Sequence, residues 1–142
     1  MMAGNENIKL VFFSKEDDEH YNKISNVISE LIPKNKVLHC CNINDFSIAV
    51  RNMLFGLGIV LIVARNKNEL NEILQIRQRL KDHSVILILD NSIEDLTHNA
   101  LQLYPRYTSY FKDDYTDVFL VIKKMITKIQ KNIKGEQNGR DY

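Results

Sequence analysis

The stretch GIVLIVA, residues 58–64, begins with a glycine and continues with six apolar residues before the polar run RNKN at 65–68. A strand that is half exposed alternates apolar with polar residues, whereas a strand covered by helices on both faces is apolar throughout. The stretch is too short for a typical helix and rich in β-branched residues. It therefore predicts a central strand of a parallel sheet.

Four further short apolar runs lie on either side of this stretch, and segments of helical period fill the gaps between them. The runs are IKLVFF (8–13), KVLHCC (36–41), SVILIL (84–89) and YTSYF (107–111). The helical segments cover roughly 17–32, 45–55, 67–81, 93–104 and 116–133. Strict alternation of this kind predicts crossover units on a parallel sheet.

The composition of the five runs predicts the order of the strands. The first, third and fourth runs are almost wholly apolar, while the second carries His39 and the fifth alternates polar with aromatic residues, as edge strands do. We therefore expect a flavodoxin-like, doubly wound, five-stranded parallel sheet of order 2-1-3-4-5 in a three-layer α/β/α arrangement. Ligands of such sheets bind beyond the carboxyl ends of the strands, near strands one and three.

Local signals predict the helix ends and the domain limits. Ser14 with Asp17, and Ser92 with Asp95, resemble capping boxes for the first and fourth helices. Asp113 and Asp114 precede the start of the last helix. We expect a disordered arm at 1–7, one domain at 8–134 and a flexible polar tail at 135–142.

Bulk properties exclude several classes of partner. A net charge of +1 gives no global field for nucleic acid. The apolar runs are far too short to span a membrane. Without an export signal at the N-terminus, we expect a cytoplasmic protein. The adjacent Cys40 and Cys41 cannot easily bridge each other, so both are expected to be buried small apolar residues.

Three segments carry a family resemblance. They are RNMLFGLGIVLIVA (51–64), ELNEILQIRQRLKDHSVILIL (69–89) and YTSYFKDDYTDVFLVIKKM (107–125). In pattern and order, they resemble the receiver domain of response regulators, from about Ile8 to Ile133. That resemblance implies paired acids after strand one that hold magnesium, an acceptor aspartate after strand three, and a hydroxyl residue after strand four. It also implies a lysine after strand five and an aromatic switch residue on strand five.

Most of these implied positions hold residues of another chemistry. The acid pair falls on Ser14 and Lys15, and the acceptor falls on Val63 or Ala64, which cannot be phosphorylated. The hydroxyl position falls on Leu89, and Lys112 alone is retained. The chain therefore resembles an atypical receiver that lacks the phospho-acceptor aspartate, and we expect no enzymatic activity.

An alternative function rests on acids displaced from the usual positions. Asp17, Asp18 and Asp90 fall near the carboxyl edge of the predicted sheet, and hard cations favour clustered carboxylates. The alternative is a metal-dependent phosphotransfer protein or small enzyme. Helix capping explains the same acids without a metal. No glycine-rich phosphate loop and no spaced histidine ligands are present, so no cofactor is predicted.

Without a phosphorylation site, function is expected on the surface. In receivers, the face made by helix four, strand five and helix five is the usual partner surface, which the resemblance places on six residues here: Leu101, Tyr107, Tyr110, Leu120, Lys123 and Lys124. We expect a phosphorylation-independent interaction module of a two-component-type system. Its partner would be a kinase, an output domain or a second copy of the chain, in which case it forms a homodimer.

Overall fold

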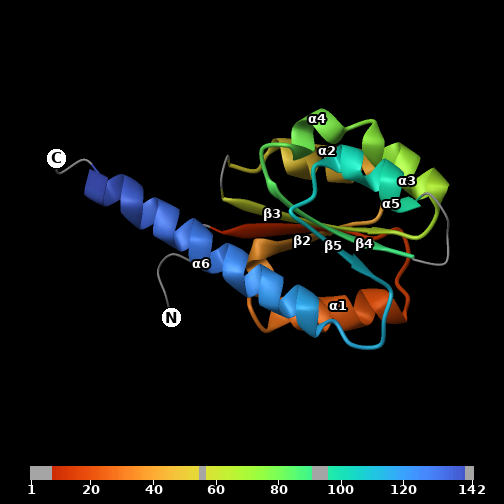
Figure 1. The fold of residues 1–142 in the computed structure, drawn as a ribbon, viewed down its shortest axis with the longest axis horizontal. Coiled ribbons are helices and arrows are strands. Elements are labelled where there is room, and N and C mark those ends of the chain that lie inside the picture. The colour runs from red at the N-terminus through yellow and green to blue at the C-terminus, as the bar shows by residue number, and fades with distance from the viewer. Residues whose placement is uncertain (1–7, 55–56, 91–95, 140–142) are drawn as a thin grey trace.

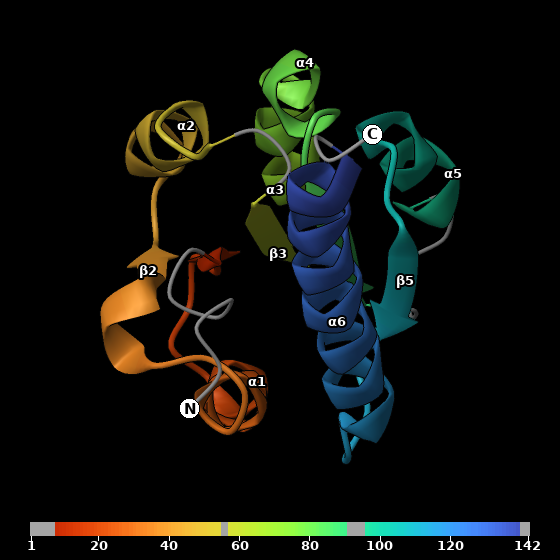
Figure 2. The same cartoon turned by 90° about the vertical axis from the view of Figure 1, so that its left-hand side faces the viewer.

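A computed structural model describes residues 8–54, 57–90 and 96–139 of the chain. Its sheet has five parallel strands in the order β2-β1-β3-β4-β5, which confirms the predicted order and fold class. Figure 2 shows β2 and β5 at opposite edges of this sheet. The strands are β1 (Lys9–Phe13), β2 (Val37–Cys40), β3 (Gly58–Ala64), β4 (Ser84–Leu89) and β5 (Tyr107–Tyr110).

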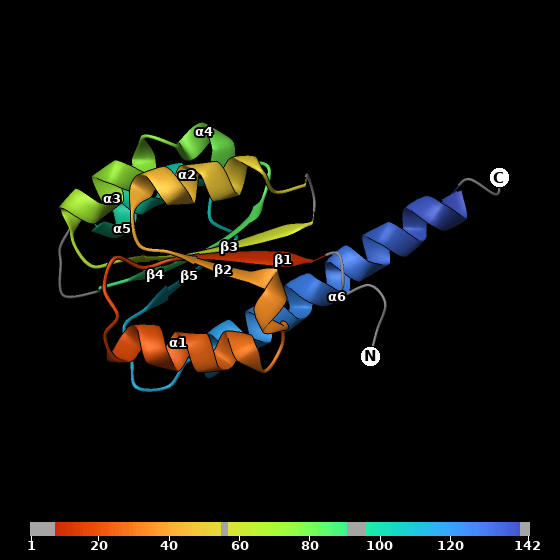
Figure 3. The ribbon, with the colours of Figure 1, turned by 180° about the vertical axis from the view of Figure 1, so that it is seen from behind.

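Helices cover both faces of the sheet and complete the three layers (Figure 1). One layer holds α1 (Glu19–Ser29) and α6 (Thr116–Gly139). The other holds α2 (Ile43–Arg51), α3 (Lys67–Leu74), α4 (Arg77–Leu80), α5 (Leu96–Ala100) and the 3-10 turn η3 (Leu101–Leu103). A second 3-10 turn, η2 (Lys34–Lys36), leads into β2. Figure 3 shows the same two layers from behind.

The alternation of side chains along β1 and β3 divides the core into two clusters. Val11, Phe13 and Ile62 pack with α2, α3 and α4, whereas Leu10 and Phe12 pack with α1 and α6. All seven residues of β3 are buried. Successive side chains of a strand point to opposite faces, so a central strand is buried throughout only when both faces are covered.

Several helix ends differ from the predicted ones. Asp18 is the N-cap of α1, where its side chain accepts a 3.0 Å hydrogen bond from the Tyr21 amide, so the prediction of Ser14 as the cap was wrong. The predicted helix at 67–81 is divided between α3 and α4. The structure supports Asp114 as a cap, since its carboxylate accepts from the Thr116 amide. Ser92 and Asp95 lie outside the described residues.

Two more expectations need correction. Helix α6 continues to Gly139, six residues past the predicted end at 133, and it extends beyond the sheet (Figure 1). Cys40 is buried but Cys41 is exposed, because β2 ends at Cys40 and the chain turns there toward the N-cap of α2. None of the helices in the described part of the chain has the length and apolarity needed to cross a membrane.

Candidate functional site at the carboxyl edge of the sheet

Arg65 is the central residue of a polar cluster at the carboxyl ends of β1 and β3. Because these strands are parallel neighbours, the residues that follow them, Ser14 and Arg65, reach the same edge of the sheet. Both side chains are buried, and that of Arg65 is only 9% exposed. A buried guanidinium requires partners for its charge and its five N–H donors.

Asp18 supplies the main partner. Arg65 Nη2 donates to Asp18 Oδ1 at 2.9 Å, and Arg65 Nε donates to Asp18 Oδ2 at 3.0 Å. Two parallel bonds between guanidinium and carboxylate form the strong, directional arrangement that lysine cannot reproduce. The pair therefore fastens the loop after β1 to the end of β3.

Other groups of the two loops complete the cluster. Arg65 Nη2 also donates to Ser14 Oγ at 2.9 Å and to the Glu16 carbonyl oxygen at 3.2 Å. Glu69 is buried in α3, and its Oε1 accepts from the Arg65 amide at 3.2 Å and lies 3.8 Å from Nη1. Glu16 Oε2 lies 3.4 Å from Nε. One positive charge is thus shared among three carboxylates.

The ionisation of the cluster follows from this geometry. The hydrogen bonds from Arg65 lower the pKa of Asp18 from 3.8 to about 2, although partial burial of the carboxylate acts in the opposite direction. Burial acts to lower the pKa of Arg65, but the hydrogen bond and charge of Asp18, with the charges of Glu69 and Glu16, raise it overall. The ion pair is therefore fully charged at neutral pH.

The structure places the residues of the predicted receiver-like pocket in separate environments. Val63, Ala64 and Leu89 are fully buried and belong to the two core clusters. Ser14 donates to the Glu16 carbonyl oxygen at 2.8 Å besides accepting from Arg65. Lys15 pairs with Glu72 of α3, with Nζ and Oε1 2.6 Å apart.

Lys112 belongs to a second cluster, centred on Asp117 in the first turn of α6. Oδ2 of Asp117 accepts from Lys112 Nζ at 3.0 Å, from Ser109 Oγ at 2.7 Å and from Tyr107 Oη at 2.8 Å. Burial opposes the charge of Asp117, but these three donors together lower its pKa. The lysine that a receiver would use at the strand end is therefore held by its own β5–α6 unit.

Aromatic contacts connect the same β5–α6 loop to α1. The ring of His20 stacks on Phe111 with centroids 4.1 Å apart, and its Nδ1 lies 2.7 Å from Tyr115 Oη. Burial is the main cause that raises the pKa of Tyr115 to about 12, so its hydroxyl stays protonated. The start of α1 is thus attached on one side to β3 and on the other to the loop before α6.

The displaced acids do not form a metal-ligand group in the described residues. Within residues 8–54, 57–90 and 96–139, no three His, Cys, Asp or Glu side chains are arranged to hold a metal ion. Asp18 faces Arg65 instead, Asp17 is exposed, and the Asp90 amide bonds to the Ala64 carbonyl oxygen at 3.4 Å. Of the three displaced acids, only Asp18 is shown in contact with the Arg65 guanidinium.

Sequence reasoning missed the role of Arg65, although a signal was present. A fully apolar strand is followed directly by Arg65, and Glu69 lies four residues later, at the spacing of one helix face. Charged residues next to a buried strand are seldom fully buried unless they are paired. Three acids at 16–18 after the neighbouring strand supply the pair.

The predicted interaction surface straddles the β5 edge. Leu101 of η3 is 59% exposed in one helical layer, and Leu120 of α6 is 51% exposed in the other. Tyr107 and Tyr110, both half-buried, point to opposite faces of β5, Tyr107 toward α6 and Tyr110 toward the α2–α5 layer. Lys123 and Lys124 are exposed beside Leu120, where they line a shallow hollow on α6 with Thr127, Lys128 and Lys131.

Comparison with known proteins identifies the fold but no sequence family. No protein-family model matches the chain, and no curated protein matches it. Solved structures do match. A CheY-like protein, TadZ, from Pseudomonas aeruginosa PAO1 aligns with a TM-score of 0.64 and 14% identity over 84% of this chain and 99% of its own.

Two more structures align similarly. A protein from Burkholderia pseudomallei K96243, described as related to pilus assembly, has a TM-score of 0.63 and 11% identity over 89% of this chain and 93% of its own. A response regulator from Colwellia psychrerythraea has a TM-score of 0.61 and 13% identity over 89% and 98%. The protein therefore has the CheY-like fold of receiver domains.

Proposed function

We propose that the protein is a receiver-like signalling module that acts through protein–protein contacts without aspartyl phosphorylation. The Arg65 cluster is the observation that carries this proposal. Phosphoryl transfer to a receiver needs a carboxylate nucleophile and a divalent cation against the developing charge. Here Glu16 and Asp18 of the β1–α1 loop pair with the Arg65 guanidinium, and the residues of β3 that precede Arg65 are Val63 and Ala64.

The Asp117 cluster supports the same proposal. The resemblance to receivers implies that the lysine after β5 is part of the phosphorylation site. In this chain Lys112 is paired with Asp117 at 3.0 Å, and the same carboxylate oxygen holds Ser109 and Tyr107. The β5 edge and the first turn of α6 are thus fixed by contacts that need no phosphate.

The first test is direct phosphorylation. The purified chain is incubated with acetyl phosphate and Mg²⁺, beside a receiver known to accept phosphate, and intact masses are recorded. We expect no phosphoryl adduct on this chain. An adduct that disappears in Asp90→Ala or Asp18→Asn, or saturable Mn²⁺ binding abolished by either change, would instead establish the metal-dependent phosphotransfer alternative.

We place the partner contact at the β5 edge, on the surface formed by Leu101, Tyr107, Tyr110, Leu120, Lys123 and Lys124. Exposed leucines and half-buried tyrosines rimmed by charge have the composition of interface hot spots. The lysines of α6 favour a partner that presents carboxylates, because complementary charge steers association.

Matched variants test this surface. Leu101→Arg and Leu120→Arg each place a charge on it, and Leu54→Arg does the same at a leucine that is 66% exposed elsewhere. A protein captured by the wild type is then purified, and its affinity for the wild type and for each variant is measured by calorimetry. We expect the affinity to fall at least tenfold, about 1.4 kcal/mol, in Leu120→Arg. Equal affinity for all variants would show that the partner does not bind at the β5 edge.

A further inference from the structure

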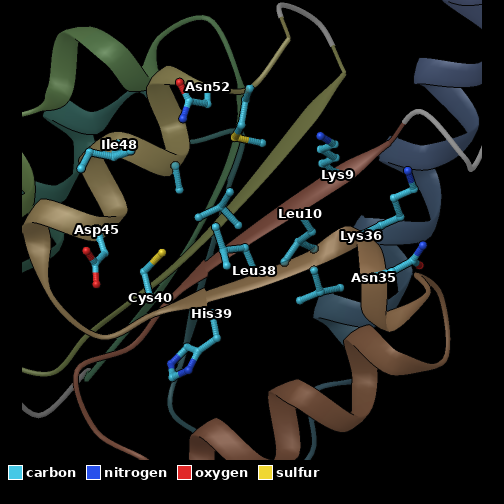
Figure 4. A pocket seen from close by; sticks show the side chains of 14 residues that line it. Lys9, Leu10, Asn35, Lys36, Leu38, His39, Cys40, Asp45, Ile48 and Asn52 are labelled. Carbon is cyan, nitrogen blue, oxygen red and sulfur yellow. The ribbon is translucent and has the colours of Figure 1, made fainter.

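A groove runs along the opposite edge of the sheet, between β2 and α2. It encloses about 500 Å³ and is lined by residues of β1, of η2 and β2, and of α2 (Figure 4). We call it the β2-edge groove and define it by six of its lining residues: Lys36, Leu38, Cys40, Asp45, Ile48 and Asn52. It lies across the sheet from the β5 edge that the proposed function uses.

The groove borders a strand edge with no neighbour among the described residues. β2 pairs with β1 on one side only. The free edge of a strand presents unpaired N–H and C=O groups that template another strand, and proteins usually protect such edges with charge or cover them. Here the middle of the edge is apolar instead, since Leu38 is 53% exposed and Ile48 of α2 is 47% exposed.

Strand parity directs these side chains to one face. Leu38 is in register with Val11, and Cys40 with Phe13, which pack on the α2 side of the sheet. Lys36, the last residue of η2, directly precedes β2 and lines the same groove. Asp45 and Ile48 of α2 and its C-cap residue Asn52 are three and four residues apart and share one helix face.

The groove is charged differently at its two ends. Lys36 and Lys9 lie at one end, and Asp45 lies at the other, beside Cys40 (Figure 4). A strand that fits beside β2 must therefore carry an apolar residue in its middle, an acidic group at the lysine end and a basic group at the Asp45 end. The β2-edge groove itself, with Lys36, Leu38 and Asp45, offers this same order when its direction is reversed.

We propose that the occupant is a second copy of this chain, paired antiparallel through β2 about a two-fold axis at Leu38. Leu38 of one copy then faces Leu38 of the other, and Lys36 lies toward the end of the other copy that holds Asp45. The two sheets join into one of ten strands, twice the five of a single chain. A parallel arrangement would place Lys36 against Lys36, which like-charge repulsion disfavours.

The mass of the protein in solution tests this dimer. By light scattering, the wild type is expected at twice the 16.6 kDa of one chain. Leu38→Arg is expected at the monomer mass, and its matched control, Leu101→Arg at the β5 edge, at the dimer mass. A monomeric wild type overturns the proposal, and so does a dimer that Leu101→Arg dissociates and Leu38→Arg does not.

Charge reversal tests the pairing of the two ends. Lys36→Glu places two acids together in its own dimer, and Asp45→Lys places two bases together, so each variant alone should be monomeric. Mixed one to one, they restore both opposite-charge contacts and should form a heterodimer. If the mixture stays monomeric while both variants keep the wild-type circular dichroism, the proposed register is wrong. That folding control is needed because Asp45 Oδ2 also accepts from the Asn42 side chain at 2.8 Å.

A disulfide tests the axis without weakening the interface. Residues opposite each other in an antiparallel pair have Cα atoms about 4.5–5.5 Å apart, within the range of about 4.4–6.8 Å that a disulfide spans. Leu38→Cys in a Cys41→Ser background should therefore give a covalent dimer that dithiothreitol cleaves. The Cys41→Ser parent should give none, because its remaining Cys40 is buried. Absence of the covalent dimer from Leu38→Cys overturns the axis at Leu38. All three tests are independent of the β5 surface and of phosphorylation.

Discussion

Arg65 Nη2 and Asp18 Oδ1 lie 2.9 Å apart, although 47 residues separate them in the chain. The contact joins the residue that follows the central strand β3 to the N-cap of α1. Asp18 therefore serves two donors at once, the Tyr21 amide and the guanidinium. This double use makes the start of α1 depend on a charge supplied by a distant part of the sequence.

Removing that charge should destabilise the fold. Arg65→Met keeps the apolar stem and the backbone amide that bonds to Glu69, but it removes the guanidinium that pairs with Asp18 and Glu69 and donates to Ser14. Breaking a fully buried ion pair costs about 3–5 kcal/mol, and because Asp18 is partly exposed we expect about 2–4 kcal/mol here. Urea unfolding measures the loss. Lys67→Met, at an exposed neighbouring position, should change stability by no more than about 0.5 kcal/mol. Equal stability of the two variants would show that the cluster does not hold the loop.

The loss of folding stability at acid pH should depend on Asp18. Its folded pKa of about 2 lies below the ordinary 3.8, so its contribution is complete above pH 3.8 and is lost as pH falls toward 2. Asp18→Asn keeps the cap acceptor but not the charge. We expect the variant to be less stable than the wild type at neutral pH, with the difference shrinking toward pH 2. Asp17→Asn, at an exposed acid, should follow the wild-type curve.

Within the Asp117 cluster, Asp117 should contribute more to stability than Lys112. Asp117→Ala leaves the hydroxyl of Ser109, a residue 1% exposed, without its acceptor, and an unsatisfied buried group costs about 1–3 kcal/mol. Lys112→Met removes a pair whose lysine is 37% exposed, which is worth about 0–1 kcal/mol. Thermal unfolding of both variants compares them. A larger loss in Lys112→Met would contradict the assignment of Asp117 as the centre of the cluster.

His83 should make the free energy of unfolding depend on pH near neutrality. Burial lowers its pKa below the ordinary 6.5, and its Nδ1 has no hydrogen-bond partner among the described residues. The unfolded chain binds this proton more readily, so stability should fall as pH decreases through 6.5. In His83→Leu this slope should disappear, whatever the absolute stability. His98→Gln, at an exposed histidine, is the control and should retain the slope.

The strand order could be predicted from sequence because a strand that is buried on both faces is apolar at every position, which its composition shows directly. The uninterrupted apolar residues of β3 and the mixed residues of β2 and β5 rank the strands by position in the sheet. The Arg65 cluster has no comparable pattern in the composition, because it forms only when side chains 47 residues apart meet at one edge of the sheet. Ser14 is an example. Its hydroxyl fits the sequence pattern of a helix cap, but in the structure it accepts from Arg65 and donates to the Glu16 carbonyl oxygen instead.

The guanidinium of Arg65 is attached to the backbone by covalent bonds. A bound ion occupies its site only in proportion to its free concentration, and a chelator removes it. Because the positive charge at this sheet edge cannot dissociate from the protein as a bound ion can, it is present in every folded molecule whatever the ionic composition of the surroundings. Chelation with EDTA should accordingly leave the melting temperature of this protein unchanged.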